Sequence, residues 1–323
     1  MIEVERLSKH YHSVRAVDRV SFAVGRGEIV GLLGPNGAGK TTTMRMLTTY
    51  LPPSSGRARL SGHDVLDEPL DVRRRVGYLP ENVPLYPEMR VREYLAYRAK
   101  LKDVPRRLRR SAIDGVLEKC KLADVESRIL GHLSKGYRQR VGLADAMVHD
   151  PDILILDEPT AGLDPMQIRE VRDLIRELGQ RHTILISTHI MPEVEAVCGR
   201  VIMIVGGRIA LDDRLDNLQT QGAIVLEVRG PFEAVRKVLA STPGVDRVGL
   251  TDHRGEIAQF EVLTRDGADL RETLAHRIFE KGWALRQLDL RRSSLEERFV
   301  RAVREAALAR DAEPTTDPET EAA

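Results

Sequence analysis

Gly34-Pro35-Asn36-Gly37-Ala38-Gly39-Lys40-Thr41 is the stretch of sequence that decides the fold of this 323-residue chain. It fits the G-x-x-x-x-G-K-[ST] pattern of a phosphate-binding P-loop. The apolar run 29–33 before it predicts a buried strand, and residues 41–47 after it predict a helix. A helix N-terminus that follows such a turn offers free backbone N–H groups and a favourable dipole to an anion. We therefore expect residues 34–41 and Thr42 to hold the phosphates of a nucleotide, with Lys40 at the β- and γ-phosphates and the Thr41 hydroxyl on Mg²⁺.

Two carboxylates follow a second apolar run and complete the expected site. Residues 153–156 read Ile-Leu-Ile-Leu, which predicts a buried strand, and Asp157 and Glu158 come directly after it. At the end of such a strand Asp157 can hold Mg²⁺ through water, and Glu158 can position the water that attacks the γ-phosphate. Taken alone, the pattern is also typical of a strand that ends in a charged turn, with Pro159 as the breaker. The P-loop upstream favours the catalytic interpretation.

Composition argues against several other classes of protein. The chain has 50 basic and 49 acidic residues, a balance that argues against a dedicated nucleic-acid-binding protein. Its two cysteines, Cys120 and Cys198, form no C-x-x-C pair, which argues against a zinc knuckle or a disulfide framework. No apolar run approaches the ~20 residues of a membrane span, and the N-terminus has no apolar signal segment. We therefore expect a cytoplasmic chain that depends on other chains for any passage through a membrane.

Residues 133–140 give the site a family resemblance. They read Leu133-Ser134-Lys135-Gly136-Tyr137-Arg138-Gln139-Arg140 and lie shortly before the strand that ends at the two carboxylates. Together with the P-loop they resemble the ATP-binding subunits of ATP-binding-cassette (ABC) transporters, whose signature is L-S-G-G-Q. Leu133, Ser134 and Gly136 match, whereas Lys135 and Tyr137 depart from the commonest form. Ser134 can cap a helix whose free N–H groups bind phosphate oxygens, so the resemblance places Ser134 and Gly136 on the ATP of a second copy.

The resemblance also assigns roles to three further positions. Tyr11 lies where the family stacks an aromatic ring on adenine. Residues 161–164, which read Ala161-Gly162-Leu163-Asp164, match the D-loop that meets the opposite subunit. His189 ends the apolar run 183–188 and matches the catalytic switch histidine that contacts the γ-phosphate. Taken alone, Tyr11 is also typical of an ordinary strand and His189 of a capping or core position.

Glu81 departs from the family pattern in a way that bears on mechanism. After Gly77-Tyr78-Leu79-Pro80 the family has the glutamine of its Q-loop, and this chain has a glutamate. A carboxylate there can ligate Mg²⁺ or water, but it adds negative charge beside ATP. The same loop contacts the transport subunits in the family, so Glu81 can instead serve only in coupling. Both interpretations stay open at this point.

Alternating strand-like and helix-like segments predict an α/β layer fold up to residue 218. The resemblance implies that residues 1–218 form the ABC ATP-binding domain, a P-loop NTPase with a RecA-like core and a helical subdomain at about residues 88–149. Within that subdomain the basic run 102–110 is either a solvated turn and helix face or a contact for an acidic partner surface or lipid headgroups.

A second, accessory domain is expected at residues 222–304. Between residues 223 and 290 the pattern predicts strand, helix, two strands, helix and strand, which is the ferredoxin-like order of a small α+β domain. A further helix is expected at 294–304, and a disordered acidic tail at 309–323. This part resembles the C-terminal extension of exporter ATPase subunits of the multidrug and gliding-motility type.

The resemblance implies an ATP hydrolase that powers a transporter, with export as the expected direction. A homodimer, or a heterodimer with a related subunit, would enclose ATP at the inner face of the cell membrane, and separate transmembrane permease subunits would carry the substrate. The alternative is a soluble ABC-type ATPase with a regulatory or nucleic-acid-associated role. Lys40 and Asp157 are only 117 residues apart with no sustained heptad run between them, which favours transport. No nucleic-acid partner is expected.

Overall fold

The computed structural model describes residues 1–220, 222–265, 268–292 and 299–300. Contacts between residues place Met1–Asp213 in one compact unit and Arg214–Val300 in a second. The acidic tail predicted at 309–323 lies outside the described residues, as does the predicted helix at 294–304 apart from residues 299 and 300. Within the described ranges, no helix combines the length and the apolar character needed to cross a membrane.

A six-stranded sheet forms the centre of the first unit. Its strand order is β10-β9-β3-β8-β7-β6, and the pairs β9–β3, β3–β8, β8–β7 and β7–β6 are parallel. The strands are β3 (Ile29–Leu33), β6 (Val76–Leu79), β7 (Ile153–Asp157), β8 (Thr183–Thr188), β9 (Arg200–Val205) and β10 (Arg208–Arg214). Every residue of β7 and β8 is buried, because layers cover both faces of a parallel sheet.

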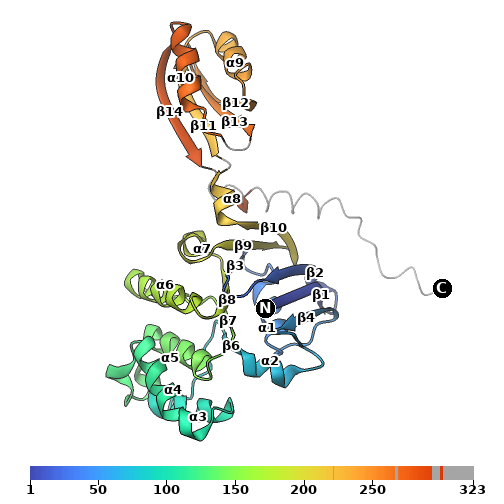
Figure 1. Cartoon of the computed structure of the whole chain (residues 1–323), viewed down its shortest axis with the longest axis vertical. Helices are drawn as coiled ribbons and strands as arrows, with labels where there is room; N and C mark the ends of the chain where they lie inside the picture. The colour runs from blue at the N-terminus through green and yellow to red at the C-terminus, as the bar shows by residue number, and fades with distance from the viewer. Residues whose placement is uncertain (221, 266–267, 293–298, 301–323) are drawn as a thin grey trace, which may run out of the picture. The chain divides into compact units, whose positions relative to one another are not determined.

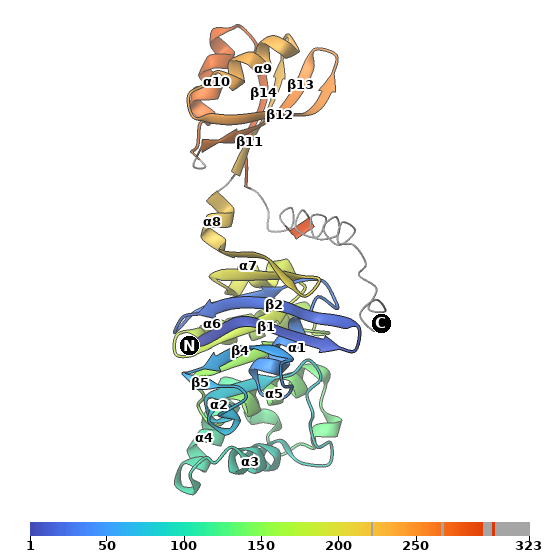
Figure 2. The same ribbon diagram turned by 90° about the vertical axis from the view of Figure 1, so that its right-hand side faces the viewer.

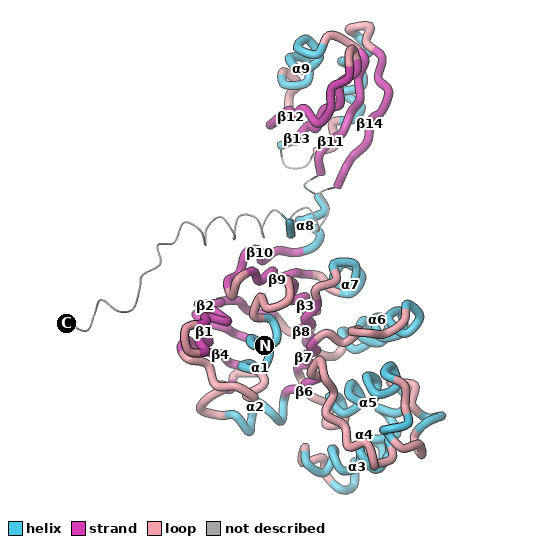
Figure 3. Tube along the Cα trace, turned by 180° about the vertical axis from the view of Figure 1, so that it is seen from behind, coloured by secondary structure: helices cyan, strands magenta, loops and turns pink. Residues whose placement is uncertain are grey.

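Helices cover one face of this sheet, and a second sheet lies beyond its other face. Figure 1 shows α5 (Lys135–Met147), α6 (Pro165–Gly179) and α7 (Met191–Val197) on the helical side, and Figure 3 shows the same layers from behind. On the other side lie α1 (Lys40–Leu47), α2 (Pro69–Arg75) and an antiparallel sheet of order β2-β1-β4-β5, which Figure 2 shows face on. Its strands are β1 (Ile2–Tyr11), β2 (Val14–Val24), β4 (Ser55–Leu60) and β5 (His63–Asp64).

Alternate side chains of β7 enter two separate apolar cores. Leu154 and Leu156 pack into the core on the helical side, and Ile153 and Ile155 pack into the core shared with α1 and the antiparallel sheet. Two cores anchor the strand on both faces. This packing fixes the position of its last residue, Asp157, at the carboxyl end of the strand, beside Thr41 of the P-loop.

The helical subdomain contains α3 (Val91–Leu101), α4 (Arg106–Lys119) and α5, together with short 3₁₀ turns at Ala123–Val125 and Leu130–His132. Part of the basic run 102–110 begins α4, as a helix face would require. Lys102 differs from that expectation because its side chain is only 18% exposed. Its Nζ lies 3.1 Å from Oδ1 of the buried Asp145, whose Oδ1 also accepts a 2.9 Å bond from Nε of Arg98.

The second unit begins with α8 (Leu215–Thr220) and continues in the order strand, helix, two strands, helix and strand. These elements are β11 (Gly222–Arg229), α9 (Phe232–Ala240), β12 (Val245–Arg254), β13 (Ile257–Thr264), α10 (Arg271–Glu280) and β14 (Ala284–Arg292). The sheet order is β12-β13-β11-β14, and the three pairs are antiparallel. Alternate residues Ile224, Leu226 and Val228 of β11 share one core with both helices, so α9 and α10 cover the same face.

We propose that residues 1–218, with the helical subdomain at 88–149, and residues 222–304 are two separately folding domains. The core of the second unit draws all its described buried residues from 224–278. Removing residues from Gly222 onward should therefore leave a folded, ATP-binding protein. Thermal unfolding followed by circular dichroism and a calorimetric ATP titration would check this, and an insoluble or non-binding product would contradict the boundary.

Candidate nucleotide-binding site

The P-loop forms the floor of a cavity of about 340 Å³ in the first unit. Residues from the P-loop and four other segments line it: Ala16, Asn36, Gly37, Ala38, Gly39, Lys40, Thr41, Thr42, Glu81, Glu158, Ala161 and His189. Gly34 and Pro35 form the preceding turn and are not among the lining residues. The structure therefore brings together the P-loop, both loops that follow β7 and β8, and the loop that follows β6.

Gly39 sets the geometry of the turn into α1. Its φ is 106°, in the left-handed region, and a Cβ placed there would lie 2.4 Å from the carbonyl oxygen of Ala16. Both the backbone conformation and the close approach require glycine. The carbonyl oxygen of Gly39 accepts the N–H of Thr43 at 2.9 Å, so α1 starts directly at the cavity with its N-terminal N–H groups toward it.

Lys40 lies folded over the P-loop. Its Nζ donates to the carbonyl oxygens of Gly34 at 2.7 Å and Pro35 at 3.2 Å, and it lies 3.8 Å from Oε1 of Glu158. Burial lowers the pKa of Lys40, and the nearby carboxylates of Glu158, Asp157 and Glu81 oppose that shift. The ammonium can exchange neutral carbonyls for phosphate oxygens, which form stronger, charge-assisted bonds.

Asp157 and Thr41 present oxygen ligands side by side. Oδ1 of Asp157 accepts hydrogen bonds from the hydroxyl of Thr41 at 3.2 Å and from the hydroxyl of Ser187. Oδ2 of Asp157 is buried, and no hydrogen-bond partner for it exists among the described residues. Burial raises the pKa of Asp157, although the two hydroxyl bonds oppose this. A carboxylate with a free buried oxygen beside a hydroxyl is the hard oxygen set that suits Mg²⁺, so these residues fit the metal.

Glu158 and His189 form a pair at the mouth of the cavity. Nδ1 of His189 lies 3.0 Å from each carboxylate oxygen of Glu158. Glu158 has a φ of 49°, which is unusual for a residue with a side chain. Its N–H is held by both the carbonyl oxygen and the hydroxyl of Ser187, each at 3.1 Å. This strained turn therefore aims a buried carboxylate back at Lys40 and His189.

The structure places the signature residues away from the P-loop of the same chain. Ser134 caps α5 and accepts the N–H of Tyr137 at 3.4 Å, while Gly136 is packed against the side chain of Gln167. Neither residue lines the cavity. Lys135 reaches the D-loop of its own chain, because a Cβ on Gly162 would lie 2.1 Å from its Nζ. Within one chain, the P-loop and the N-terminus of α5 therefore lie at separate places.

Some of the other residues expected at the site line the cavity, and others lie outside it. In the D-loop, Ala161 lines the cavity, Leu163 packs against the core on the helical side, and Asp164 caps α6 by accepting the N–H groups of Met166 and Gln167 at 3.0 and 2.9 Å. Tyr11, at the end of β1, is 43% exposed and is not a lining residue. Glu81 is exposed and lines the cavity.

Two residues of the site were not expected from the sequence. Ala16 lies on β2 and offers only its backbone and a methyl group. Ser187 lies next to the last residue of the buried strand β8, and its hydroxyl within an apolar run was the available signal. Its hydroxyl donates to the carboxylate of Asp157 and accepts the backbone N–H of Glu158, and so it links that carboxylate to the turn at Glu158.

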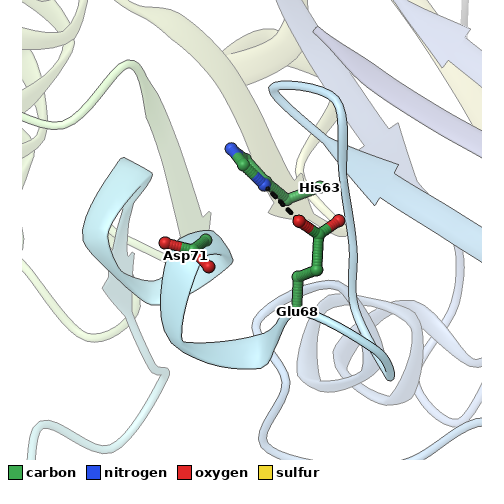
Figure 4. Close-up of side chains that lie close together, drawn as sticks. All are labelled: His63, Glu68 and Asp71. Atoms are coloured by element: carbon green, nitrogen blue, oxygen red, sulfur yellow. Dashed lines mark hydrogen bonds and ion pairs between the residues drawn. The ribbon is translucent and has the colours of Figure 1, made fainter.

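Another group of possible metal ligands lies outside this cavity, at the start of α2 (Figure 4). Nδ1 of His63 lies 3.0 Å from Oε1 of Glu68, and Asp71 lies close by. Arg74 already pairs with Asp71 at 3.2 Å, and Glu68 also accepts the N–H of Asp64. These bonds stabilise the first turn of α2, which is a structural role for this partly exposed cluster.

Comparisons with known proteins place this chain in one family. The sequence model of the family described as ABC transporter matches residues 17–161. The uncharacterized ABC transporter ATP-binding protein YxlF of Bacillus subtilis (strain 168) is 41% identical over 221 residues, which cover 68% of this chain and 73% of that protein. The chain belongs to the family of ABC transporter ATP-binding proteins. The resemblance carried by the P-loop and by residues 133–140 is thus confirmed.

Two further comparisons, one with a relative and one with a solved structure, also show similarity to ABC proteins. Daunorubicin resistance ATP-binding protein DrrA3 of Streptomyces coeruleorubidus is 34% identical over 322 residues, covering 95% of this chain and 98% of that protein. A solved structure described as an ATP-binding subunit of an ABC transporter has a TM-score of 0.63 at 32% identity, and covers 68% of this chain and 92% of its own. They confirm the ABC-type P-loop fold and an ATP-binding subunit of an ABC transporter, and neither supports the regulatory or nucleic-acid alternative.

Proposed function

We propose that this protein hydrolyses MgATP between two copies of itself and thereby drives export through separate membrane-spanning permease subunits. The observation that carries the proposal is the arrangement around one cavity of Lys40, the Asp157–Thr41 pair and the Glu158–His189 pair. Catalysis of phosphoryl transfer consists mainly of positioning and charge stabilisation, and this arrangement provides both.

Each side chain has a role in that reaction. The N-terminal N–H groups of α1 and the ammonium of Lys40 bind the β- and γ-phosphates. Thr41 and Asp157 hold Mg²⁺, which when bound neutralises charge on the phosphate oxygens. Glu158 positions the attacking water and accepts its proton, and His189 orients Glu158 and contacts the γ-phosphate. Tyr11 lies at the end of a strand with its ring exposed on one side and the ammonium of Lys9 5.5 Å from the ring centroid, and its role is to stack on adenine.

The second copy completes the site. Ser134 and Gly136 stand at the N-terminus of α5, whose N–H groups suit a phosphate, yet they do not reach the P-loop of their own chain. A head-to-tail partner would bring this N-terminus onto the γ-phosphate, with residues 161–164 at the contact between copies. Two ATP molecules would then join the pair.

A groove of about 620 Å³ in the first unit offers a place for the permease. Basic side chains outnumber acidic ones along it, with Arg45, Arg73, Arg74, Arg98 and Lys102 against Asp103 and Asp145. Tyr50 and Leu70 also line it and are 76% and 62% exposed. The groove therefore fits a segment that carries both a carboxylate and apolar side chains. We assign it to a loop of the permease at the inner face of the membrane.

Reconstitution tests this function. The protein should co-purify with a membrane protein encoded beside it, and vesicles that contain both should move a substrate outward only when ATP is supplied. A cysteine placed at Leu70 should cross-link to the membrane protein. The name of the relative DrrA3, a daunorubicin resistance ATP-binding protein, makes daunorubicin a sensible first substrate to test. If ATP is hydrolysed but no substrate moves, hydrolysis is not coupled to transport. If ATP is not hydrolysed at all, the proposed ATPase activity is wrong.

Glu81→Gln should relax the dependence of ATP binding on Mg²⁺ while preserving turnover. Glu81 lines the ATP cavity, and its negative charge is tolerable beside phosphates only if a metal offsets it. Neighbouring residues Pro80, Asn82 and Val83 line the permease groove, so this loop touches both sites. Binding curves with and without Mg²⁺ for both proteins would check the prediction. If ATP binding by the variant and the wild type depends on Mg²⁺ to the same extent, Glu81 does not act on the metal, and its remaining role is coupling to the permease.

A further inference from the structure

A buried glutamate joins the two loops that carry the catalytic pair. Glu193, on α7, is only 6% exposed. Its Oε1 accepts a hydrogen bond from Oγ1 of Thr160 at 2.6 Å, and its Oε2 accepts one from Oγ1 of Thr188 at 2.8 Å. Both threonines are buried as well. One carboxylate thus uses its two oxygens to join a side chain of the loop after β7 to one at the end of β8.

The two threonines flank Glu158 and His189 in the sequence. Thr160 comes two residues after Glu158, and Thr188 comes directly before His189. Each threonine also forms a hydrogen bond with a residue that follows it closely in the sequence. The hydroxyl of Thr188 accepts the N–H of Ile190 at 3.1 Å, and the carbonyl oxygen of Thr160 accepts the N–H of Leu163 at 3.2 Å. The position of Glu193 therefore fixes how the loop after β7 lies against the loop after β8.

Glu193 does not reach the nucleotide cavity, so any effect on chemistry must pass through these loops. Arg172 of α6 lines the same small cavity of about 10 Å³ as Glu193 and both threonines. Among the residues that the structure describes, no ion pair joins Arg172 to Glu193, and Nε of Arg172 has no hydrogen-bond partner. The two threonine hydroxyls are therefore the side-chain groups that hold this carboxylate directly.

We infer that Glu193 is a positioning residue for ATP hydrolysis, a clamp that holds residues 158–161 and 187–190 together. By fixing Thr160 and Thr188, it keeps Nδ1 of His189 within 3.0 Å of both oxygens of Glu158. The inference rests on the proposed hydrolysis of ATP. It adds a third residue, outside the cavity, on which the geometry of the catalytic pair depends.

Four variants test the clamp. Glu193→Ala removes both hydrogen bonds and should lower kcat about 10–100-fold, because small misplacements of reacting groups have effects of that size. Glu193→Gln keeps two polar atoms for the two hydroxyls and should stay within about threefold of the wild type. Thr160→Val removes one hydrogen bond at nearly constant side-chain shape, and its kcat should lie between those of Glu193→Ala and Glu193→Gln. Glu195→Ala, on the exposed side of α7, is the matched control and should have no effect.

Three readouts distinguish a clamp from a general structural role. ATP affinity should stay within about twofold in every variant, so the loss lies in kcat and not in KM. Combining Glu193→Ala with His189→Ala should add little to the loss caused by His189→Ala, since both act through one pair. Hydrogen exchange should show that the amides of residues 158, 160 and 161 and those of 187–190 lose protection together in Glu193→Ala and keep it in Glu195→Ala.

Hydrogen exchange separates failure of the clamp from failure of the proposed function. If the wild-type protein does not hydrolyse ATP, the function fails, and the exchange data still test the clamp. Unchanged kcat in Glu193→Ala, additive losses with His189→Ala, or unchanged protection in either loop would each overturn the clamp. If Glu193→Ala does not fold, Thr160→Val and Glu193→Gln decide in its place: equal kcat for Thr160→Val and the wild type would overturn it.

Discussion

Glu158→Gln should bind ATP normally and hydrolyse it about 10²–10⁴-fold more slowly, the usual effect of losing a positioned general base. The glutamine amide keeps the size of the side chain but cannot accept a proton from water. In the wild type the carboxylate lies 3.0 Å from Nδ1 of His189 and 3.8 Å from Nζ of Lys40, so it is placed to act on a γ-phosphate bound at Lys40. Phosphate release under single-turnover conditions measures the effect.

Glu177→Gln is the matched control for that variant. Glu177 lies on the exposed face of α6 and is not a lining residue of the cavity, so its charge can be removed without touching the site. It should turn over like the wild type. If Glu158→Gln hydrolyses ATP at nearly the wild-type rate, Glu158 is not the general base.

Lys40→Ala should weaken ATP binding by one to two decades. Lys40 is the lysine that lines the cavity, and charge-assisted bonds of this kind contribute about 1.5–3 kcal/mol each. Isothermal titration with MgATP measures the loss. Lys119→Ala removes an exposed lysine at the end of α4 and should leave affinity unchanged. Equal affinity of Lys40→Ala and the wild type would show that ATP binds elsewhere.

The central sheet could be predicted because its signal is local. Runs 29–33, 153–156 and 183–188 became β3, β7 and β8 with ends that differ by at most one residue. Strands of a parallel sheet are buried on both faces and therefore appear as continuous apolar runs. The P-loop was equally plain, because Gly39 must adopt a left-handed φ and lie against Ala16 at a fixed place in the motif.

Contacts between distant residues could not be predicted in this way. Glu193 bonds Thr160 across 33 positions, and nothing in either segment indicates the partner. Lys102 illustrates the same limit. Its place in a basic run favoured a solvated surface, yet its ammonium bonds the backbone oxygen of Asp145, 43 residues away, inside the subdomain. Charge patterns report on composition, whereas burial depends on which elements come together.

The proposed role of Ser134 and Gly136 depends on a second copy of the chain. Within one chain they lie outside the cavity, although they stand at a helix N-terminus suited to phosphate. The proposal of a site shared by two copies therefore has a testable consequence. ATP must hold two copies together whenever hydrolysis is blocked.

Light scattering on Glu158→Gln with MgATP tests this most directly. The account predicts a mass of two chains with MgATP, each of 36.2 kDa, and a mass of one chain without nucleotide. Adding Lys40→Ala to the same variant should restore the single-chain mass at MgATP concentrations well below its weakened affinity, since most of its sites would then be empty. A single-chain mass for Glu158→Gln at saturating MgATP would contradict the shared site.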